Sequence, residues 1–218
     1  MKKEREHVLD QDKASTEALV KNLSSSVDKE RENAAESLVR LGNTWVSFAD
    51  AATIKSLIND LTNEREVRRD RVRRLLSALN KKALPALVKG LKSDNHRLKE
   101  ESARVLGTIK NREAAEALIG ALEDDIFDVR WLAGEGLISI GDIALEPVFS
   151  ALTKRSDSTL IREGLHRVLH GMYRESDQVL IKPVLLALED SESRLEVPLA
   201  AETALNSLRA SRKISVRV

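Results

Sequence analysis

The sequence predicts an all-α protein, a right-handed α-solenoid built from about six two-helix repeats. The 218-residue chain has 3% aromatic residues, 9 glycines and 4 prolines, a composition that suits helices better than sheets. Leucine and alanine recur at helical spacing. The same pattern returns every 31 to 37 residues. Two helices at that period cannot bury both faces alone, so neighbouring pairs are expected to stack.

Six nine-residue stretches mark the second helix of each repeat. They read ERENAAESL from Glu30, VRRDRVRRL from Val67, LKEESARVL from Leu98, VRWLAGEGL from Val129, IREGLHRVL from Ile161 and VPLAAETAL from Val197. Each stretch ends in leucine, so these leucines form one apolar stripe. Leu106 and Leu137, which close the two most regular stretches, are predicted to be deeply buried.

A shorter apolar helix precedes each stretch, as in ALPALVKGLKSD and AAEALIGALEDD. Its closing leucines are Leu23, Leu61, Leu91, Leu122, Leu152 and Leu188. The predicted repeats span residues 16–43, 50–82, 83–111, 112–142, 143–172 and 177–210 of one solenoid, with a charged segment at 1–15 and a tail at 211–218. Turns rich in Ser, Asp, Asn and Glu supply oxygens for the N-caps.

The stretch EALIGALEDDIFDVRWLAGEGLISIGD resembles the HEAT-like repeat of the phycobilisome-lyase type. It has a leucine pair, an acidic turn, Val-Arg, small residues, and a leucine followed by a closing glycine. Residues 83–142 match best, while Pro198 replaces the arginine and Arg71 the usual alanine in outer repeats. The resemblance implies a HEAT-like solenoid whose second helices line a concave groove.

Composition excludes several classes of function. Lys and Arg total 36 against 35 Asp and Glu, so the net charge of +1 attracts neither nucleic acid nor membranes. The chain has no cysteine, no apolar run of membrane-spanning length and no signal-peptide core, so a cytoplasmic protein is expected. It also lacks a phosphate loop, a nucleophile elbow and a His-Glu zinc helix, so no catalytic residue and no cofactor are predicted.

The third and seventh places of each second helix are predicted to face the groove. They hold Glu32 and Glu36, Arg69 and Arg73, Glu100 and Arg104, Trp131 and Glu135, Glu163 and Arg167, and Leu199 and Thr203. Because four of the five positions equivalent to Trp131 are charged, this tryptophan is predicted to lie outside the core. A shallow apolar site is expected around it, with Glu135 beside the indole and Ile138 at the far edge.

Two glycines follow Trp131 on the same helix. Gly134 is interpreted as the small residue that lets neighbouring helices approach and leaves room for the indole. Gly136 is interpreted as a position where the helix has less side-chain bulk beside its large neighbour. Trp45, in an irregular link, is predicted to fill the gap between the first two repeats.

Arginines on the groove face suggest a second contact region. Residues 50–82 hold nine Lys or Arg against five Asp or Glu, and Arg65, Arg69 and Arg73 share one helix face. They form either a basic patch for a phosphate or acidic partner, which glutamine substitutions would alter without unfolding, or a solvated face balanced by neighbouring charge. Arg104 and Arg167 are predicted to contact a partner, or to pair with Glu100 and Glu163 on their own helices.

The acidic fourth repeat argues against duplex DNA as a partner. Residues 112–142 hold two Lys or Arg against eight Asp or Glu, and this would interrupt a continuous basic stripe. In EGLHRVLH, Glu163, His166 and His170 share a helix face and form a weak metal candidate. Three ligands from one helix make an incomplete cage, so no metal is predicted.

The sequence therefore favours a non-enzymatic scaffold that holds another protein in its groove. Two alternatives stay open, both by analogy of fold. One is a bilin-lyase-like enzyme, which the repeat type suggests. The other is a HEAT-like DNA glycosylase, for which Trp131 and Asp128 are the candidate pair.

Overall fold

The computed structural model describes residues 14–174, 178–190 and 193–215. Every regular element in these ranges is helical, which confirms the predicted all-α class. The chain divides into two compact units, residues 1–105 and 106–218. Most of the predicted N-terminal segment, residues 1–13, and the last three residues of the chain lie outside the described residues.

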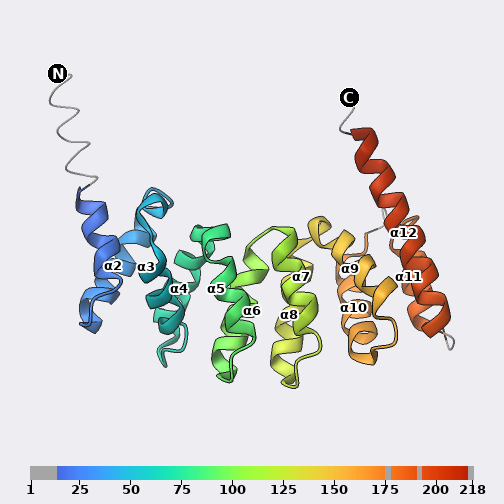
Figure 1. Ribbon diagram of the computed structural model, residues 1–218, viewed down its shortest axis with the longest axis horizontal. Coiled ribbons are helices and arrows are strands. Elements are labelled where there is room, and N and C mark those ends of the chain that lie inside the picture. The colour runs from blue at the N-terminus through green and yellow to red at the C-terminus, as the bar shows by residue number, and fades with distance from the viewer. Residues whose placement is uncertain (1–13, 175–177, 191–192, 216–218) are drawn as a thin grey trace. The chain divides into compact units, whose positions relative to one another are not determined.

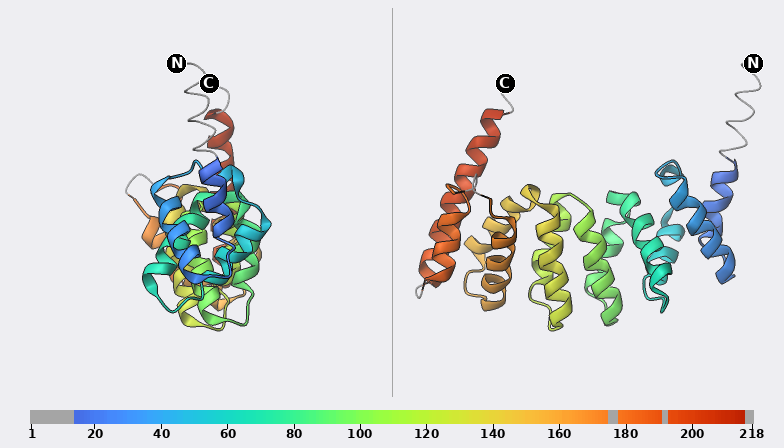
Figure 2. Two further views of the ribbon diagram at one scale, coloured as in Figure 1. Left: turned by 90° about the vertical axis from the view of Figure 1, so that its left-hand side faces the viewer. Right: turned by 180° about the vertical axis from the view of Figure 1, so that it is seen from behind.

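The helices follow the predicted pairing along the chain. After a helix at residues 14–22, the order is α2 (Asp28–Arg40), the 3-10 turn η1 (Val46–Phe48), α3 (Ala51–Asp60), α4 (Glu66–Leu79), η2 (Asn80–Lys82), α5 (Leu84–Leu91), α6 (His96–Thr108), α7 (Arg112–Ala121), α8 (Phe127–Ile140), α9 (Asp142–Lys154), α10 (Thr159–Met172), α11 (Lys182–Glu189) and α12 (Ser193–Ser215). In the first unit α4 packs on α2 and α3 (Figure 1). In the second unit α8 packs on α7 and α10, and α12 on α9 and α11 (Figure 2). Stacked helix pairs of this kind are the architecture of an α-solenoid.

Polar side chains cap several helices, but the N-cap prediction holds only in part, because α2, α4 and α8 begin without a side-chain cap. The side chain of Asp50 accepts a hydrogen bond from the Thr53 N–H at 2.8 Å, and Asn111 accepts one from Ala114 at 2.7 Å. Ser158 caps α10 in the same way. These oxygens satisfy backbone donors that have no partner within the first turn of a helix.

An arginine near the start of the second helix also donates hydrogen bonds to the backbone of the turn that precedes this helix. Arg31, Arg69 and Arg130 donate to carbonyl oxygens six residues upstream, at 2.6, 2.6 and 2.7 Å. Arg162 makes the same contact with Ser156. The arginine at the second place of the aligned stretch, or at the third place in α4, therefore closes its own helix hairpin.

The closing leucines of the second helices all lie in the core. Leu38, Leu75, Leu106, Leu137, Leu169 and Leu205 are buried. This confirms the predicted stripe, including full burial of Leu106 and Leu137. The first-helix anchors are buried too, except Leu188, which is partly exposed. Trp45 is also fully buried, as expected for a residue that fills a gap.

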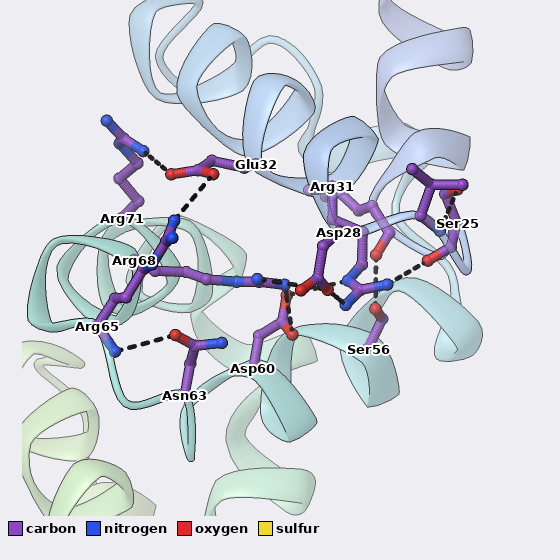
Figure 3. A network of polar contacts seen from close by, with 12 residues as sticks. Ser25, Asp28, Arg31, Glu32, Ser56, Asp60, Asn63, Arg65, Arg68 and Arg71 are labelled. Atoms are coloured by element: carbon purple, nitrogen blue, oxygen red, sulfur yellow. Dashed lines mark hydrogen bonds and ion pairs between the residues drawn. The ribbon is translucent and has the colours of Figure 1, made fainter.

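A polar layer crosses the first unit where α2, α3 and α4 meet (Figure 3). Arg68 of α4 is 6% exposed and reaches both carboxylate oxygens of Asp60 at 3.0 Å. Asp28 lies 3.5 Å from the same guanidinium. Burial disfavours the charge, but the hydrogen bond and charge of Asp60 and the charge of Asp28 raise the pKa of Arg68 above its ordinary value. The ends of three helices are thus joined around one cation.

The predicted C-terminal tail is helical as far as Ser215, because arginines of α12 hold it against α9. Arg209 and Arg212 each lie 3.0 Å from Glu146, and Arg112 of α7 lies 3.2 Å from the same carboxylate. Burial opposes ionisation of this carboxyl, but hydrogen bonds from Arg209 and Arg112 and their charges hold the pKa of Glu146 below its ordinary value.

Gly136 lies at a close approach between α8 and the end of α6. A Cβ added at Gly107 would lie 2.6 Å from the Gly136 Cα, a separation at which backbone has to move. The sequence interpretation assigned the close approach to Gly134 and only reduced side-chain bulk to Gly136. The structure places the close approach at Gly136 instead.

Replacing Gly107 with alanine is expected to lower the free energy of unfolding by about 1–3 kcal/mol, because the added methyl group overpacks this contact. The matched control is Gly120→Ala in α7, where an added Cβ meets nothing within 4 Å. There alanine is expected to raise stability by up to about 1 kcal/mol through its higher helix propensity. Urea unfolding measures both. Equal effects of the two substitutions would contradict the close approach.

Candidate partner-binding site

A pocket of about 190 Å³ opens between the N-terminal halves of α8 and α10, within the second unit. Its lining consists of Leu122, Phe127, Arg130, Trp131, Leu160, Glu163, Gly164 and Arg167. Most of this lining is apolar, and its charged groups belong to Arg130, Glu163 and Arg167. We call it the α8–α10 pocket.

The α8–α10 pocket presents two aromatic side chains to solvent. Phe127 and Trp131 lie one turn apart on α8, with ring centroids 6.2 Å apart. Phe127 is 62% exposed and Trp131 48% exposed, so Trp131 lies outside the core as predicted. Leu160 of α10 is exposed as well. Large apolar side chains grouped on a surface are typical of interaction sites.

Arg167 of α10 holds the indole in place. Its guanidinium carbon lies 3.9 Å from the centroid of the Trp131 ring, and its Nη2 donates to the Trp131 carbonyl at 2.9 Å. Nη1 lies 3.7 Å from Glu135. A cation over the face of a solvent-exposed indole contributes about 0.5–1 kcal/mol. The predicted pair of Glu163 with Arg167 is wrong, since this arginine turns to the preceding repeat.

Gly134 makes the Arg167 contact possible. A Cβ at residue 134 would collide with the Arg167 guanidinium. The glycine therefore gives room to an arginine of the next repeat, whereas the sequence interpretation gave that room to the indole. On the opposite wall, a Cβ at Gly164 would lie 3.1 Å from Leu122, so this glycine lets α10 pack closely against Leu122.

The pocket carries charges of both signs, because its lining includes Arg130, Arg167 and Glu163. Arg130 lies 5.6 Å from the Phe127 ring, and it donates to the carbonyls of Asp124 and Asp125 at 2.7 and 3.0 Å. Arg130 and Arg167 thus hydrogen-bond to backbone carbonyls, which hold the side chains without neutralising their charges, and Arg167 also lies near a carboxylate, that of Glu135. Asp128 and Glu163 are exposed, and neither forms an ion pair with any residue that the structure describes.

The basic patch of the first unit is neutralised within the protein. Glu101 of α6 is 5% exposed and lies 3.2 Å from Arg69 and 2.8 Å from Arg73. Both arginines also contact Glu66. Arg65 remains 76% exposed, 3.7 Å from Glu32. Of the two interpretations of this face, the balance by neighbouring charge matches the structure, and an open anion site at Arg69 and Arg73 does not.

The remaining predicted groove residues lie apart from the pocket. Ile138 does not line it, and its Cδ1 lies 2.5 Å from where a Cβ of Gly171 would be. Arg104 is exposed on α6 within the first unit and forms no ion pair with Glu100 among the described residues. The structure therefore brings Trp131, Glu135 and Arg167 together, and leaves the other predicted contact residues elsewhere.

The histidine pair of α10 meets a different carboxylate from the predicted one. The groups whose ligand atoms converge are His166, His170 and Glu189, the last residue of α11. Glu163 lines the α8–α10 pocket instead. Sequence reasoning missed Glu189, because no spacing within α10 indicates it. It also missed Phe127, although an aromatic residue four places before Trp131 on one helix was a readable signal.

The described helices include none with both the length and the apolar content required to cross a bilayer. No curated protein shows significant similarity to the chain. Among solved structures, an engineered protein is 21% identical over 90% of this chain and 97% of its own, with a TM-score of 0.41. A designed armadillo repeat protein in complex with the peptide (KR)4 is 18% identical over 87% of this chain and 98% of its own, with a TM-score of 0.42.

The complex of CpcE and CpcF of phycocyanin lyase from Nostoc sp. is 23% identical over 78% of this chain and 70% of its own, with a TM-score of 0.45. A family model for HEAT repeats matches residues 51–138 and, in an overlapping second match, residues 84–169. These matches span more than half of the sequence and include the stretch that carries the pocket. The chain belongs to the HEAT-repeat family.

Proposed function

We propose that this protein is a non-enzymatic scaffold that binds another protein through the α8–α10 pocket. The observation that carries the proposal is the exposed pair of Phe127 and Trp131, held in place by Arg167. Aromatic residues dominate the binding energy of protein interfaces, and a rigidly held indole loses little entropy on binding. No catalytic residue takes part in this role.

The size of the pocket supports a side chain as its occupant. Pockets for small molecules and cofactors commonly measure about 300–1,000 Å³. The α8–α10 pocket, at about 190 Å³, is smaller than that range. A single large apolar side chain of a partner suits this volume better than a tetrapyrrole does.

The charge around the pocket supports a basic partner segment. Glu163 lines the pocket and Asp128 is exposed on α8, and neither carboxylate is in an ion pair within the described residues, while Arg130 and Arg167 are held by hydrogen bonds to backbone carbonyls. Lysine or arginine beside the inserted side chain would meet these carboxylates. We therefore propose a segment that presents one large apolar side chain flanked by basic residues.

Replacing Trp131 with alanine is expected to weaken binding of such a segment by about 2 kcal/mol or more, roughly 30-fold. The free energy of unfolding should change by less than about 1 kcal/mol, because the indole is exposed in the free protein. The probes are short fluorescein-labelled peptides with one tryptophan, phenylalanine or leucine flanked by lysines. Fluorescence anisotropy measures their affinity, and the same anchors flanked by glutamates test the charge preference.

The matched control is Leu199→Ala, which removes an exposed apolar side chain from the same place in the last repeat. It should leave peptide affinity unchanged. In a Trp45→Phe background, acrylamide should quench the Trp131 emission, and bound peptide should protect it. Equal affinity for lysine- and glutamate-flanked peptides would contradict the proposal, as would wild-type affinity of the Trp131 variant or preferential binding of duplex DNA.

A further inference from the structure

His166 and His170 converge on a single carboxylate oxygen of the neighbouring helix. Their Nε2 atoms each lie 3.4 Å from Glu189 Oε1. The two rings stand edge to face, with centroids 4.7 Å apart. The histidines lie one turn apart on α10, and Glu189 ends α11, so the cluster spans the junction of these helices.

The separations are long for direct hydrogen bonds. An N–H···O bond in proteins typically measures about 2.7–3.2 Å between heavy atoms, with the commonest value near 2.9 Å. Both imidazoles lie beyond that range from the carboxylate oxygen, at 3.4 Å. The two histidines thus share long contacts with one carboxylate oxygen, at the weak end of the hydrogen-bond range.

The same separations match the ligand shell of a small divalent ion. Zinc binds histidine nitrogen and carboxylate oxygen at about 2.0–2.1 Å in a tetrahedron, which places ligand atoms about 3.3–3.4 Å apart. The two nitrogen-to-oxygen distances equal that tetrahedral edge, and all three ligand atoms lie within 4.8 Å of one another. A small rotamer adjustment can therefore seat the ion.

Accessibility and donor chemistry agree with this geometry. The side chains of His166, His170 and Glu189 are 35, 55 and 50% exposed, so an ion from solution reaches them. Two imidazoles and one carboxylate are ligands that zinc and its neighbours in the first transition row prefer. Water can fill the fourth position.

We propose that His166, His170 and Glu189 bind one divalent transition-metal ion of the zinc type and that the ion ties α10 to α11. The ligand set differs from the single-helix set of Glu163, His166 and His170, because its carboxylate comes from a second helix. An ion held by two helices binds the folded protein in preference to the unfolded chain, so it adds stability in proportion to its free concentration.

The test is titration of the tag-free full chain with zinc chloride in a calorimeter, together with thermal unfolding with and without zinc. We expect one ion per chain and a higher midpoint of unfolding with zinc. Glu189→Ala and His170→Ala should each weaken binding at least about tenfold and abolish the rise in midpoint. Circular dichroism checks that both variants fold.

Two controls separate this site from its alternatives. Glu163→Gln removes the carboxylate that shares the α10 face, and His96→Ala removes a histidine of α6; both should bind zinc as the wild type does. Loss of binding in Glu163→Gln would overturn the proposed ligand set in favour of one helix. Wild-type binding by Glu189→Ala would reduce the site to a histidine pair, and the absence of binding heat in the wild type would overturn it entirely.

Discussion

Replacing Arg69 and Arg73 together with glutamine is expected to lower the free energy of unfolding of the first unit by about 3–5 kcal/mol. Both guanidiniums pair with Glu101, whose side chain is almost fully buried. Without them the carboxylate remains buried with no compensating charge, and removing one partner of a buried ion pair is strongly destabilising for this reason. The sequence alone predicted that replacing Arg65, Arg69 and Arg73 with glutamine leaves folding intact, and the burial of Glu101 leads to the opposite expectation.

The matched control is a double substitution of exposed arginines on the same segment, Arg65→Gln with Arg74→Gln. Their side chains are 76 and 65% exposed, and their ion pairs lie in solvent. Surface pairs of this kind contribute about 0–1 kcal/mol each. Urea unfolding followed by circular dichroism compares the two double variants. Similar losses in both would mean that Glu101 is less dependent on its partners than the geometry indicates.

Leu137→Ala is expected to cost about 2–5 kcal/mol of stability in the second unit. Leu137 is fully buried in α8, which packs on α7, α9 and α10. Truncation leaves a cavity that these helices fill only in part. Because neighbouring repeats of a solenoid stabilise one another, amide hydrogen exchange should accelerate in α7 and α10 as well as in α8.

The control for Leu137 is Leu186→Ala, which removes the same atoms from an exposed position in α11. It should change stability by less than about 0.5 kcal/mol. Hydrogen exchange followed by mass spectrometry resolves the helices. Unchanged protection of α10 in the Leu137 variant would show that the repeats unfold independently and would contradict their stacking.

Periodicity was sufficient to predict the fold and the core. The leucine that closes the nine-residue stretch of each second helix is buried in all six repeats. Side chains on one face of an amphipathic helix share the same environment, so their burial does not depend on which helix packs against them. The same reasoning predicted correctly that Trp131 lies outside the core. These properties depend on the helix itself and therefore follow from the local sequence.

The partners of the polar side chains were not predictable in this way. Arg69 pairs with Glu101, 32 residues away, and Arg167 contacts Trp131, 36 residues away. Glu123 meets Arg155 and Ser158, 32 and 35 residues away. These separations equal about one repeat, because equivalent helices of successive repeats lie side by side. Helical spacing within one repeat proposed nearer partners, such as Glu163 for Arg167, and so assigned the wrong contacts.

The arginines that reach back to the preceding turn have a consequence for how such a chain can lengthen during evolution. Arg31, Arg130 and Arg162 each bind a carbonyl six residues upstream, inside their own helix hairpin. Closure of the hairpin thus needs no residue from a neighbouring copy. A duplicated repeat would carry both the arginine and the carbonyl that close its hairpin. Because the acceptor is a backbone carbonyl, the side chains of the turn could change while this hydrogen bond persists. Gene duplication within the array would then add ready-made modules, leaving selection to act on the residues between them.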